Sequence, residues 1–334
     1  MKSSWLRISL IVIAILVIVY YLGPRPVTPR YDPLLPTVPQ QPSALDQYVA
    51  TKESFHKLKP DNEARIVWYD SLHHKTPFSV VYLHGFSASQ EEGNPVHRDF
   101  AKRYGCNLYL SRLDGHGLDT SEPLLTMTAS GLWRDAKEAL GIGKALGEKV
   151  ILVTCSTGST LGLKLAATYP NDIYAIINMS PNVAINDDMA FLANNPWGLQ
   201  LARLVCNGDY RQAPPKKPEL GKYWYNKYRL EAVVELESLL ETTMEPGVFH
   251  SVKQPALNVY YFRDKEHQDP TVKVSAILAM HKALGTPADK KEAVAIPDAD
   301  AHVIGCYLTS KDVPAVERVI DSFAEKKLGL LPVK

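Results

Sequence analysis

Several features that mark common functional classes are scarce or missing in this 334-residue chain. Its four cysteines, Cys106, Cys155, Cys206 and Cys306, stand far apart and form no CxxC pair, which argues against a zinc site. No basic run is long enough for a nucleic-acid groove, and the formal net charge is only +1. A phosphate-binding glycine loop and a dinucleotide fingerprint are also lacking, so we expect no cofactor and no metal.

Apolar side chains, in contrast, make up 46% of the residues, enough to bury one large core. Short hydrophobic runs alternate with segments of helical periodicity, which predicts a mostly parallel sheet with helices on both faces. Near its start, Asn62–Ser71 and Phe78–Leu83 are expected to pair as antiparallel strands. Further strands are expected at Asn107–Leu113, Asp172–Met179, Ala256–Phe262 and Ala293–Ile296, and helices at Ser130–Leu146 and Val272–Leu284.

The most informative segment is Lys149–Gly158, which reads KVILVTCSTG. It predicts a buried strand and a sharp turn with Ser156 at its tip, followed by a helix over Ser159–Tyr169. Such a turn lifts a serine hydroxyl clear of the sheet and points backbone N–H groups at the group it attacks. Ser156 is therefore the candidate nucleophile, although the segment alone also fits an ordinary strand–loop–helix crossing. Ser159 and Ser180 lie off the tip of the turn.

A second segment supplies hydrogen-bond donors. The strand over residues 78–83 ends in His84-Gly85-Phe86, where the glycine allows a tight turn. The N–H of Phe86 could then face the serine and, with the N–H of Thr157, form an oxyanion hole. His84 and His116 are expected to hydrogen-bond the backbone of loops around the site instead of acting as the base.

The base and its carboxylate partner are expected further along the chain. An acidic loop with Asp264, Glu266 and Asp269 follows the strand predicted at 256–262. His302 follows the last predicted strand. The order is thus serine, acid, histidine, each after a strand. This suits a mechanism in which a base takes the hydroxyl proton and a carboxylate holds that base in one tautomer.

From about Asn62 to Leu328 the chain resembles the serine α/β-hydrolases, particularly the monoacylglycerol-lipase and carboxylesterase-like group. Another marker is Arg112–Gly117 (RLDGHG), similar to the loop that follows the next strand in that family. The chain departs from the family at Thr154, where the turn usually has glycine. A β-branched residue there is expected to crowd the turn.

The resemblance implies an α/β-hydrolase fold and a Ser156–Asp269–His302 triad that cleaves carboxylic esters through an acyl-enzyme. Asp269 best matches the family's aspartate, with Asp264 next and Glu266 third. The expected substrates are monoacylglycerols or other uncharged acyl esters. Two alternatives are kept: hydrolysis of another bond type, amide or C–C, and a non-catalytic, membrane-tethered binding module.

Between residues 182 and 250 the strand–helix alternation stops, and we expect a helical cap insertion that covers the serine. Its aromatic side chains either form the core of the cap or line an acyl-binding tunnel. The expected cap is apolar and has no clustered Arg or Lys, which favours an uncharged, partly aliphatic substrate. The aromatic residues are Trp197, Tyr210, Tyr223, Trp224, Tyr225 and Tyr228.

The N-terminal region divides into two parts ahead of the hydrolase domain at 44–334. Residues 1–23 contain the aliphatic run Ile8–Leu22 and are expected to be a membrane anchor or a signal segment, with the catalytic domain outside the cytoplasm. Residues 24–43 form a proline-rich linker. The linker is expected to be either an extended polyproline II spacer or a strap on the domain surface.

Overall fold

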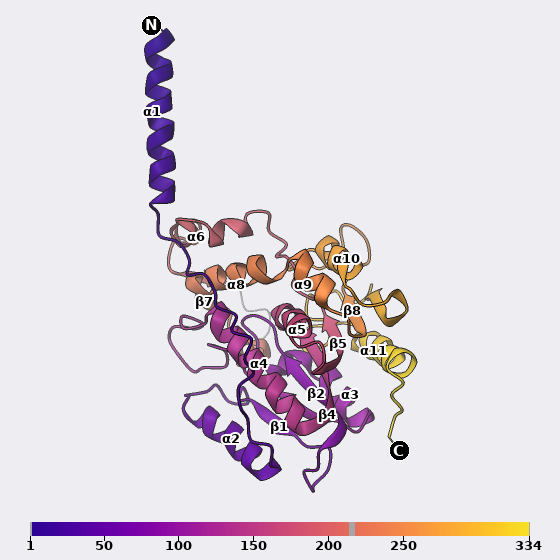
Figure 1. Cartoon of the computed structure of the whole chain (residues 1–334). Coiled ribbons are helices and arrows are strands. Elements are labelled where there is room, and N and C mark those ends of the chain that lie inside the picture. Colours follow the sequence, from indigo (N-terminus) through magenta and orange to yellow (C-terminus); the bar gives the residue numbers. More distant parts are fainter. Residues whose placement is uncertain (1, 214–217, 334) are drawn as a thin grey trace.

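The computed structural model describes residues 2–213 and 218–333, with residues 2–4 described by their backbone alone. Within these ranges a sheet with helices around it forms the centre of the molecule (Figure 1). The sheet has seven strands in the order β1-β3-β2-β4-β5-β8-β9. β1 runs antiparallel to β3, and the other neighbouring strands are parallel. The strands are β1 (Arg65–Val67), β2 (Thr76–Leu83), β3 (Asn107–Leu110), β4 (Gly147–Cys155), β5 (Ile173–Met179), β8 (Ala256–Tyr260) and β9 (Lys291–Ala295).

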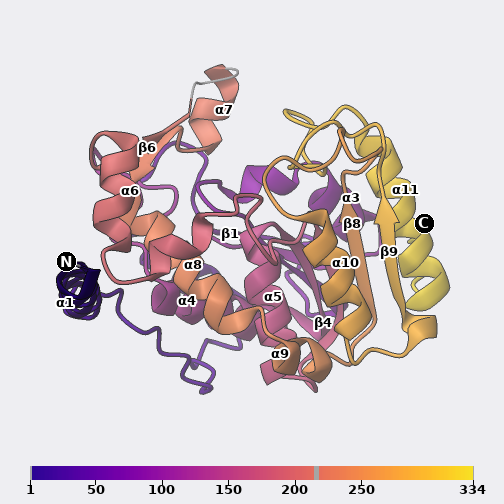
Figure 2. The same ribbon diagram turned by 90° about the horizontal axis from the view of Figure 1, so that it is seen from above.

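Helices cover both faces of the sheet because its strands are apolar on both sides. In β2, Val80 and Tyr82 belong to one buried cluster, while Val81 and Leu83 belong to the other, as the two-residue period of a strand requires. α3 (Val96–Arg103) and α11 (Val313–Lys327) pack on the first face. Figure 2 shows α5 and α10 on the opposite side. That second face is covered by α2 (Pro42–Ser54), α4 (Ala129–Leu146), α5 (Thr157–Thr168), α9 (Pro246–Ser251) and α10 (Val274–Ala283).

The predicted early antiparallel pair is wrong. β1 pairs with β3, with Arg65 opposite Leu110, and not with β2. Both edges of β2 are already occupied, by β3 on one side and β4 on the other. The first strand therefore extends the sheet at its edge. The other predicted strands and helices are confirmed, with ends that differ by a few residues.

An insertion separates β5 from β8. It contains mostly helices, together with a small antiparallel hairpin. In Figure 2 α6, β6, α7 and α8 gather on the side away from α11. Its elements are η2 (Ala190–Asn194), α6 (Gly198–Cys206), β6 (Tyr210–Gln212), α7 (Pro218–Tyr223), β7 (Lys227–Arg229) and α8 (Leu230–Thr243), followed by α9; short turns η1 (Gln90–Gly93) and η3 (Ala288–Lys290) lie elsewhere.

The first helix, α1 (Lys2–Tyr21), projects from the rest of the molecule (Figure 1). In the described part of the chain no helix is both long enough and apolar enough to cross a membrane, so the predicted membrane anchor is not supported.

The proline-rich segment that follows α1 is a strap on the surface of the domain. The backbone carbonyl of Asp32 accepts a hydrogen bond from Trp133 of α4 at 2.9 Å. The carbonyl of Pro33 accepts one from Tyr169, at the end of α5, at 2.7 Å. Of the two predicted alternatives, an extended spacer and a surface strap, the structure shows the strap.

Candidate active site

Ser156 sits at the sharp turn between β4 and α5, with φ 50° and ψ −118°. A non-glycine residue rarely adopts a positive φ, and such strain is common at functional sites. The turn is tight because α5 begins directly against the end of β2. A Cβ on Gly158 would lie 2.0 Å from the carbonyl oxygen of Leu83, so only glycine fits there. The backbone of Ser156 is fixed by hydrogen bonds to Met179 and Asn182.

Thr154, which precedes this turn, is fully buried but keeps its hydroxyl satisfied. Its Oγ1 lies 2.8 Å from Ser159 Oγ and donates to Asn178 Oδ1, also at 2.8 Å. The hydroxyl of Ser159 thus lies below the turn, against β4. Ser180 Oγ, in turn, donates to the carbonyl oxygen of His302 at 2.5 Å.

The structure brings Ser156, His302 and Asp269 together. His302 Nε2 lies 2.9 Å from Ser156 Oγ, and its Nδ1 lies 2.7 Å from Asp269 Oδ2. Because a carboxylate only accepts hydrogen bonds, Nδ1 carries the proton and Nε2 is free to accept from the serine. Ser156 and Asp269 are 6% and 1% exposed, which keeps this chain of hydrogen bonds largely out of water.

Asp269 is held in place by its own loop. Its Oδ1 accepts hydrogen bonds from the backbone N–H groups of Thr271 and Val272, at 2.8 and 3.0 Å. The alternative acid, Asp264, lies on the exposed part of the loop and binds His267 Nδ1 at 2.9 Å. Glu266, the third candidate, is also exposed. Of the three acids, Asp269 is the one that contacts His302.

Electrostatics favour a strong base at this position. Burial by itself lowers the pKa of His302, but the charge and hydrogen bond of Asp269 and the charge of Glu92 together raise it above the ordinary 6.5. A raised pKa means that the imidazolium is stabilised, which a general base requires while it holds the proton of the serine.

Phe86 and Thr157 present their backbone N–H groups without an acceptor among the described residues. The Thr157 amide is the first of α5, and the first amides of a helix have no partner within it. Phe86 follows Gly85, which packs on the serine: a Cβ on Gly85 would lie 2.9 Å from Ser156 Cβ. Two buried side-chain atoms, Oγ1 of the next residue Thr157 and Oδ1 of Asn182, also lack a partner in the described part of the chain.

The prediction that His84 and His116 brace the loops is confirmed. His84 Nε2 accepts a hydrogen bond from Leu113 N at 3.1 Å, and His116 Nε2 accepts one from Ser87 N at 3.0 Å. The centroids of the two imidazole rings lie 4.9 Å apart. Burial lowers the pKa of His116 to about 4 and that of His84 well below its usual value, so both rings are neutral.

One buried residue of this region was missed by the sequence analysis. Glu92 of η1 is 2% exposed, and its carboxylate accepts a hydrogen bond from the backbone N–H of Gly85. In the sequence it follows Gln90 and Glu91, and such a polar run is typical of an exposed loop. Nothing in the neighbouring sequence distinguishes Glu92 from an exposed loop residue.

The insertion lies against the loop that carries Phe86. Tyr225 N donates to the carbonyl oxygen of Ser87 at 2.8 Å, and the rings of Phe86 and Tyr228 meet edge to face with centroids 5.0 Å apart. Asn182, where the insertion starts, donates its N–H to the carbonyl oxygen of Ser156 at 3.1 Å. The aromatic residues Tyr225 and Tyr228 therefore pack beside the loop that follows β2.

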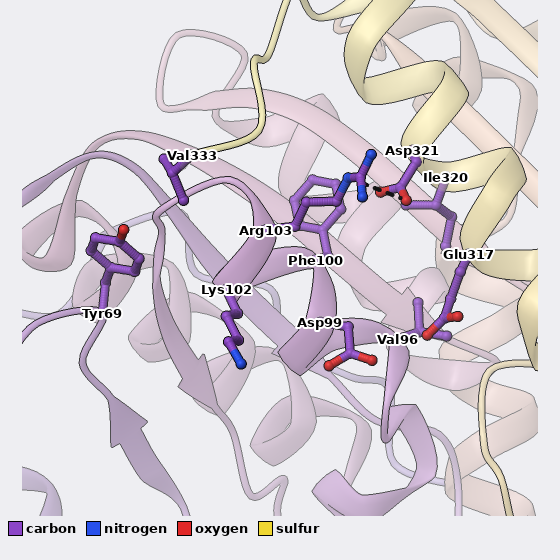
Figure 3. A pocket seen from close by; sticks show the side chains of 10 residues that line it. All are labelled: Tyr69, Val96, Asp99, Phe100, Lys102, Arg103, Glu317, Ile320, Asp321 and Val333. Carbon is purple, nitrogen blue, oxygen red and sulfur yellow. Dashed lines mark ion pairs between the residues drawn. The ribbon is translucent and has the colours of Figure 1, made fainter.

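A separate cavity of about 530 Å³ shares no lining residue with the site around Ser156. It lies between α3, α11 and the C-terminal segment, where Arg103 forms an ion pair with Asp321 (Figure 3). Its floor is apolar at Val96 and Phe100. Within the described ranges no group of three or more His, Cys, Asp or Glu side chains could hold a metal ion.

No family model matches this chain, and no curated protein matches it in sequence. Several solved structures have a similar fold. One comes from work on LipS and LipT, two metagenome-derived lipolytic enzymes, with a TM-score of 0.64, 19% identity, and coverage of 80% of this chain and 100% of that one.

Two more are named as lipases. A soluble variant of the monoglyceride lipase of Saccharomyces cerevisiae, bound to a substrate analog, has a TM-score of 0.60 and 12% identity, covering 79% of this chain and 91% of that one. The monoacylglycerol lipase of Paleococcus ferrophilus has a TM-score of 0.58 and 14% identity, covering 79% and 98%. These likenesses, with the sheet order, confirm that the chain has the α/β-hydrolase fold.

Proposed function

We propose that this protein is a serine hydrolase that cleaves carboxylic esters through an acyl-enzyme. The observation that carries the proposal is the continuous hydrogen-bonded chain from Ser156 through His302 to Asp269. An ordinary loop serine would have no such base within 2.9 Å and no buried carboxylate behind that base. The fold shared with lipases and esterases supports the same reading.

In the proposed reaction Ser156 Oγ attacks the ester carbonyl carbon while His302 Nε2 takes its proton. Asp269 keeps the ring in the required tautomer and stabilises the imidazolium. His302 then gives the proton to the leaving alcohol. A water molecule attacks the acyl-enzyme with the same base, releasing the acid and restoring Ser156.

The negative oxygen that forms in both steps would be bound by the N–H groups of Phe86 and Thr157. Both amides lack another acceptor in the described structure, so they are available without breaking a hydrogen bond. Each such donor is worth about 3 kcal/mol in the transition state.

The substrate that we infer is uncharged and partly apolar, as in a monoacylglycerol or another acyl ester. The insertion brings Tyr225 and Tyr228 against the Phe86 loop, and we take it to be a cap over the serine. Hydrophobic and aromatic walls suit an acyl chain and give an anionic group no partner.

Two measurements test this function. A fluorophosphonate probe should label the wild-type protein, and a p-nitrophenyl ester should be hydrolysed. Ser156→Ala should lose both while keeping the wild-type circular dichroism spectrum. Ser159→Ala, which removes the neighbouring hydroxyl, is the control and should still be labelled. Labelling of Ser156→Ala at the wild-type rate would refute the assignment, and a panel of esters and amides would identify the bond that is cleaved.

A further inference from the structure

Glu92 is a buried carboxylic acid next to the site that the proposed mechanism does not use. Its Oε2 accepts hydrogen bonds from the backbone N–H of Gly85 and, at 3.3 Å, from the hydroxyl of Tyr82. Burying a carboxyl group is costly unless its oxygens are satisfied. No Lys, Arg or His forms an ion pair with Glu92 in the described structure, and its Oε2 accepts from a backbone amide and a hydroxyl group instead.

Its position relative to the serine is close. A Cβ on Gly85 would lie 2.7 Å from Glu92 Oε1 and 2.9 Å from Ser156 Cβ. Gly85 is therefore packed between the carboxyl group and the nucleophile. The next residue along the chain is Phe86, whose N–H is the proposed oxyanion donor. Because Glu92 binds the amide of Gly85, it fixes the peptide that leads directly into that donor.

The carboxyl group is also coupled to the base. The titratable groups that face Glu92 are Tyr82 on β2, Cys155 on β4, and His302 and Cys306 after β9. The pKa of Glu92 is raised to about 7, because burial outweighs the Gly85 hydrogen bond and the charge of His302, which both lower it. In return, the charge of Glu92 adds to that of Asp269 in raising the pKa of His302.

We propose that Glu92 is a positioning residue of this site, which aims the Phe86 N–H at the oxyanion and adds a second negative charge that stabilises the protonated His302. The proposal rests on the function proposed above and names a part of the same site. It predicts two separable effects: one on the maximal rate, through the Phe86 peptide, and one on the pH dependence, through the charge.

The sign of the pH effect follows from the charge. At and above about pH 7, where Glu92 is ionised, its charge raises the pKa of His302, so removing that charge lowers the pKa of His302. His302 must be neutral to accept the serine proton, and its deprotonation would then be complete at lower pH. The acid limb of the rate profile should therefore move to lower pH when Glu92 is made neutral.

The test compares three variants by the rate of fluorophosphonate labelling across the acid and neutral range. Glu92→Gln keeps an oxygen that can accept from Gly85 but has no charge. Glu92→Leu loses both. Glu91→Gln is the matched control, because Glu91 is the adjacent buried acid of η1 and binds Asn94 and Tyr307 instead of the Gly85 loop.

For Glu92→Gln we expect the midpoint of the acid limb to fall by up to about one pH unit, with a modest loss of plateau rate. For Glu92→Leu we expect the plateau rate to fall by up to about 10²-fold, as for a misplaced catalytic group. Glu91→Gln should keep the wild-type midpoint. A role in packing alone would change stability or the plateau without moving the midpoint.

The inference is overturned if Glu92→Gln keeps the wild-type midpoint or moves it to higher pH. If Glu92→Leu fails to fold, the midpoint of Glu92→Gln still decides the matter. Failure of the proposed function looks different, since wild-type protein would then not be labelled at any pH, and both proposals would be withdrawn.

Discussion

The methyl group of Thr154 occupies the space that a side chain on Gly162 would need: a Cβ on Gly162 would lie 3.0 Å from Thr154 Cγ2. Thr154 is the residue at which this chain departs from the glycine usual before the nucleophile turn. The structure shows how the departure is accommodated. The extra methyl group fits because α5 carries a glycine opposite it, and the hydroxyl is satisfied by Ser159 and Asn178.

This contact predicts that substitutions at residues 154 and 162 have non-additive effects on the free energy of unfolding. In an ordinary helix, glycine to alanine stabilises by about 1 kcal/mol. Gly162→Ala in the wild-type chain should lose that gain or become destabilising, because the new methyl group meets Thr154. In a Thr154→Ser background, which keeps the hydroxyl and removes the methyl group, the gain should return. Urea unfolding of the four proteins measures the coupling, and additive effects within about 0.5 kcal/mol would contradict it.

The assignment of Asp269 as the triad acid can be tested by comparing kcat of variants at Asp269 and Asp264. Asp269→Asn should lower kcat by about 10⁴-fold, because an amide in that place no longer favours the productive tautomer of His302. Asp264→Asn changes only exposed contacts within its own loop, with Glu266 and His267, and should leave kcat within a factor of two or so. Steady-state hydrolysis of a p-nitrophenyl ester would show the difference. Similar losses in both variants would mean that the acid has been wrongly assigned.

In the proposed mechanism the raised pKa of His302 sets the pH at which activity appears. Burial opposes this rise, but the charge and hydrogen bond of Asp269 and the charge of Glu92 outweigh it, so the pKa lies above the ordinary 6.5. The general base works only when neutral. The rate constant kcat/KM should therefore increase with pH through a midpoint above 6.5 and be lost as pH falls below it. A midpoint clearly below that value, measured with a substrate that does not titrate, would contradict this account.

Gly158 and Gly247 form a matched pair for testing the tightness of the turn. A Cβ on Gly158 would lie 2.0 Å from the Leu83 carbonyl oxygen, whereas one on Gly247 would meet nothing within 4 Å. We expect Gly158→Ala to lower the free energy of unfolding by at least about 2 kcal/mol, because backbone must move. Gly247→Ala should be neutral or stabilising by up to about 1 kcal/mol. Thermal or urea denaturation would check both, and equal effects would show that α5 can shift away from β2.

Much of the fold could be predicted because each buried parallel strand is a local apolar run. The segments that became β5, β8 and β9 are bounded by polar or proline-containing turns and can be located without knowing their neighbours. The partner of β1 could not be found in this way. Arg65–Val67 is short and half-buried, and nothing in those residues says that β3 comes between it and β2.

Some residues of the candidate site could likewise be predicted from the sequence, and others could not. Ser156, Asp269 and His302 follow strands in a recognisable order, so the sequence indicated which residues would meet at one edge of the sheet. Glu92 has no such signal, because its burial depends on how the loop after β2 folds back over Gly85. Which aspartate contacts His302 could be decided only from the structure. Asp264 and Asp269 belong to the same loop, and only the fold of that loop determines which of them is buried beside the histidine.

The strap has a consequence for any attempt to shorten the protein at its N-terminus. Tyr31 hydrogen-bonds Thr242 of α8 at 2.6 Å and stacks edge to face on Trp133 of α4. Removing all residues before α2 would expose Trp133 and Tyr169 to solvent. It would also remove the contacts through which Tyr31 joins α4 to α8 of the insertion. Such a fragment should melt at lower temperature and bind hydrophobic dyes, while a chain cut back only to residue 23 should do neither.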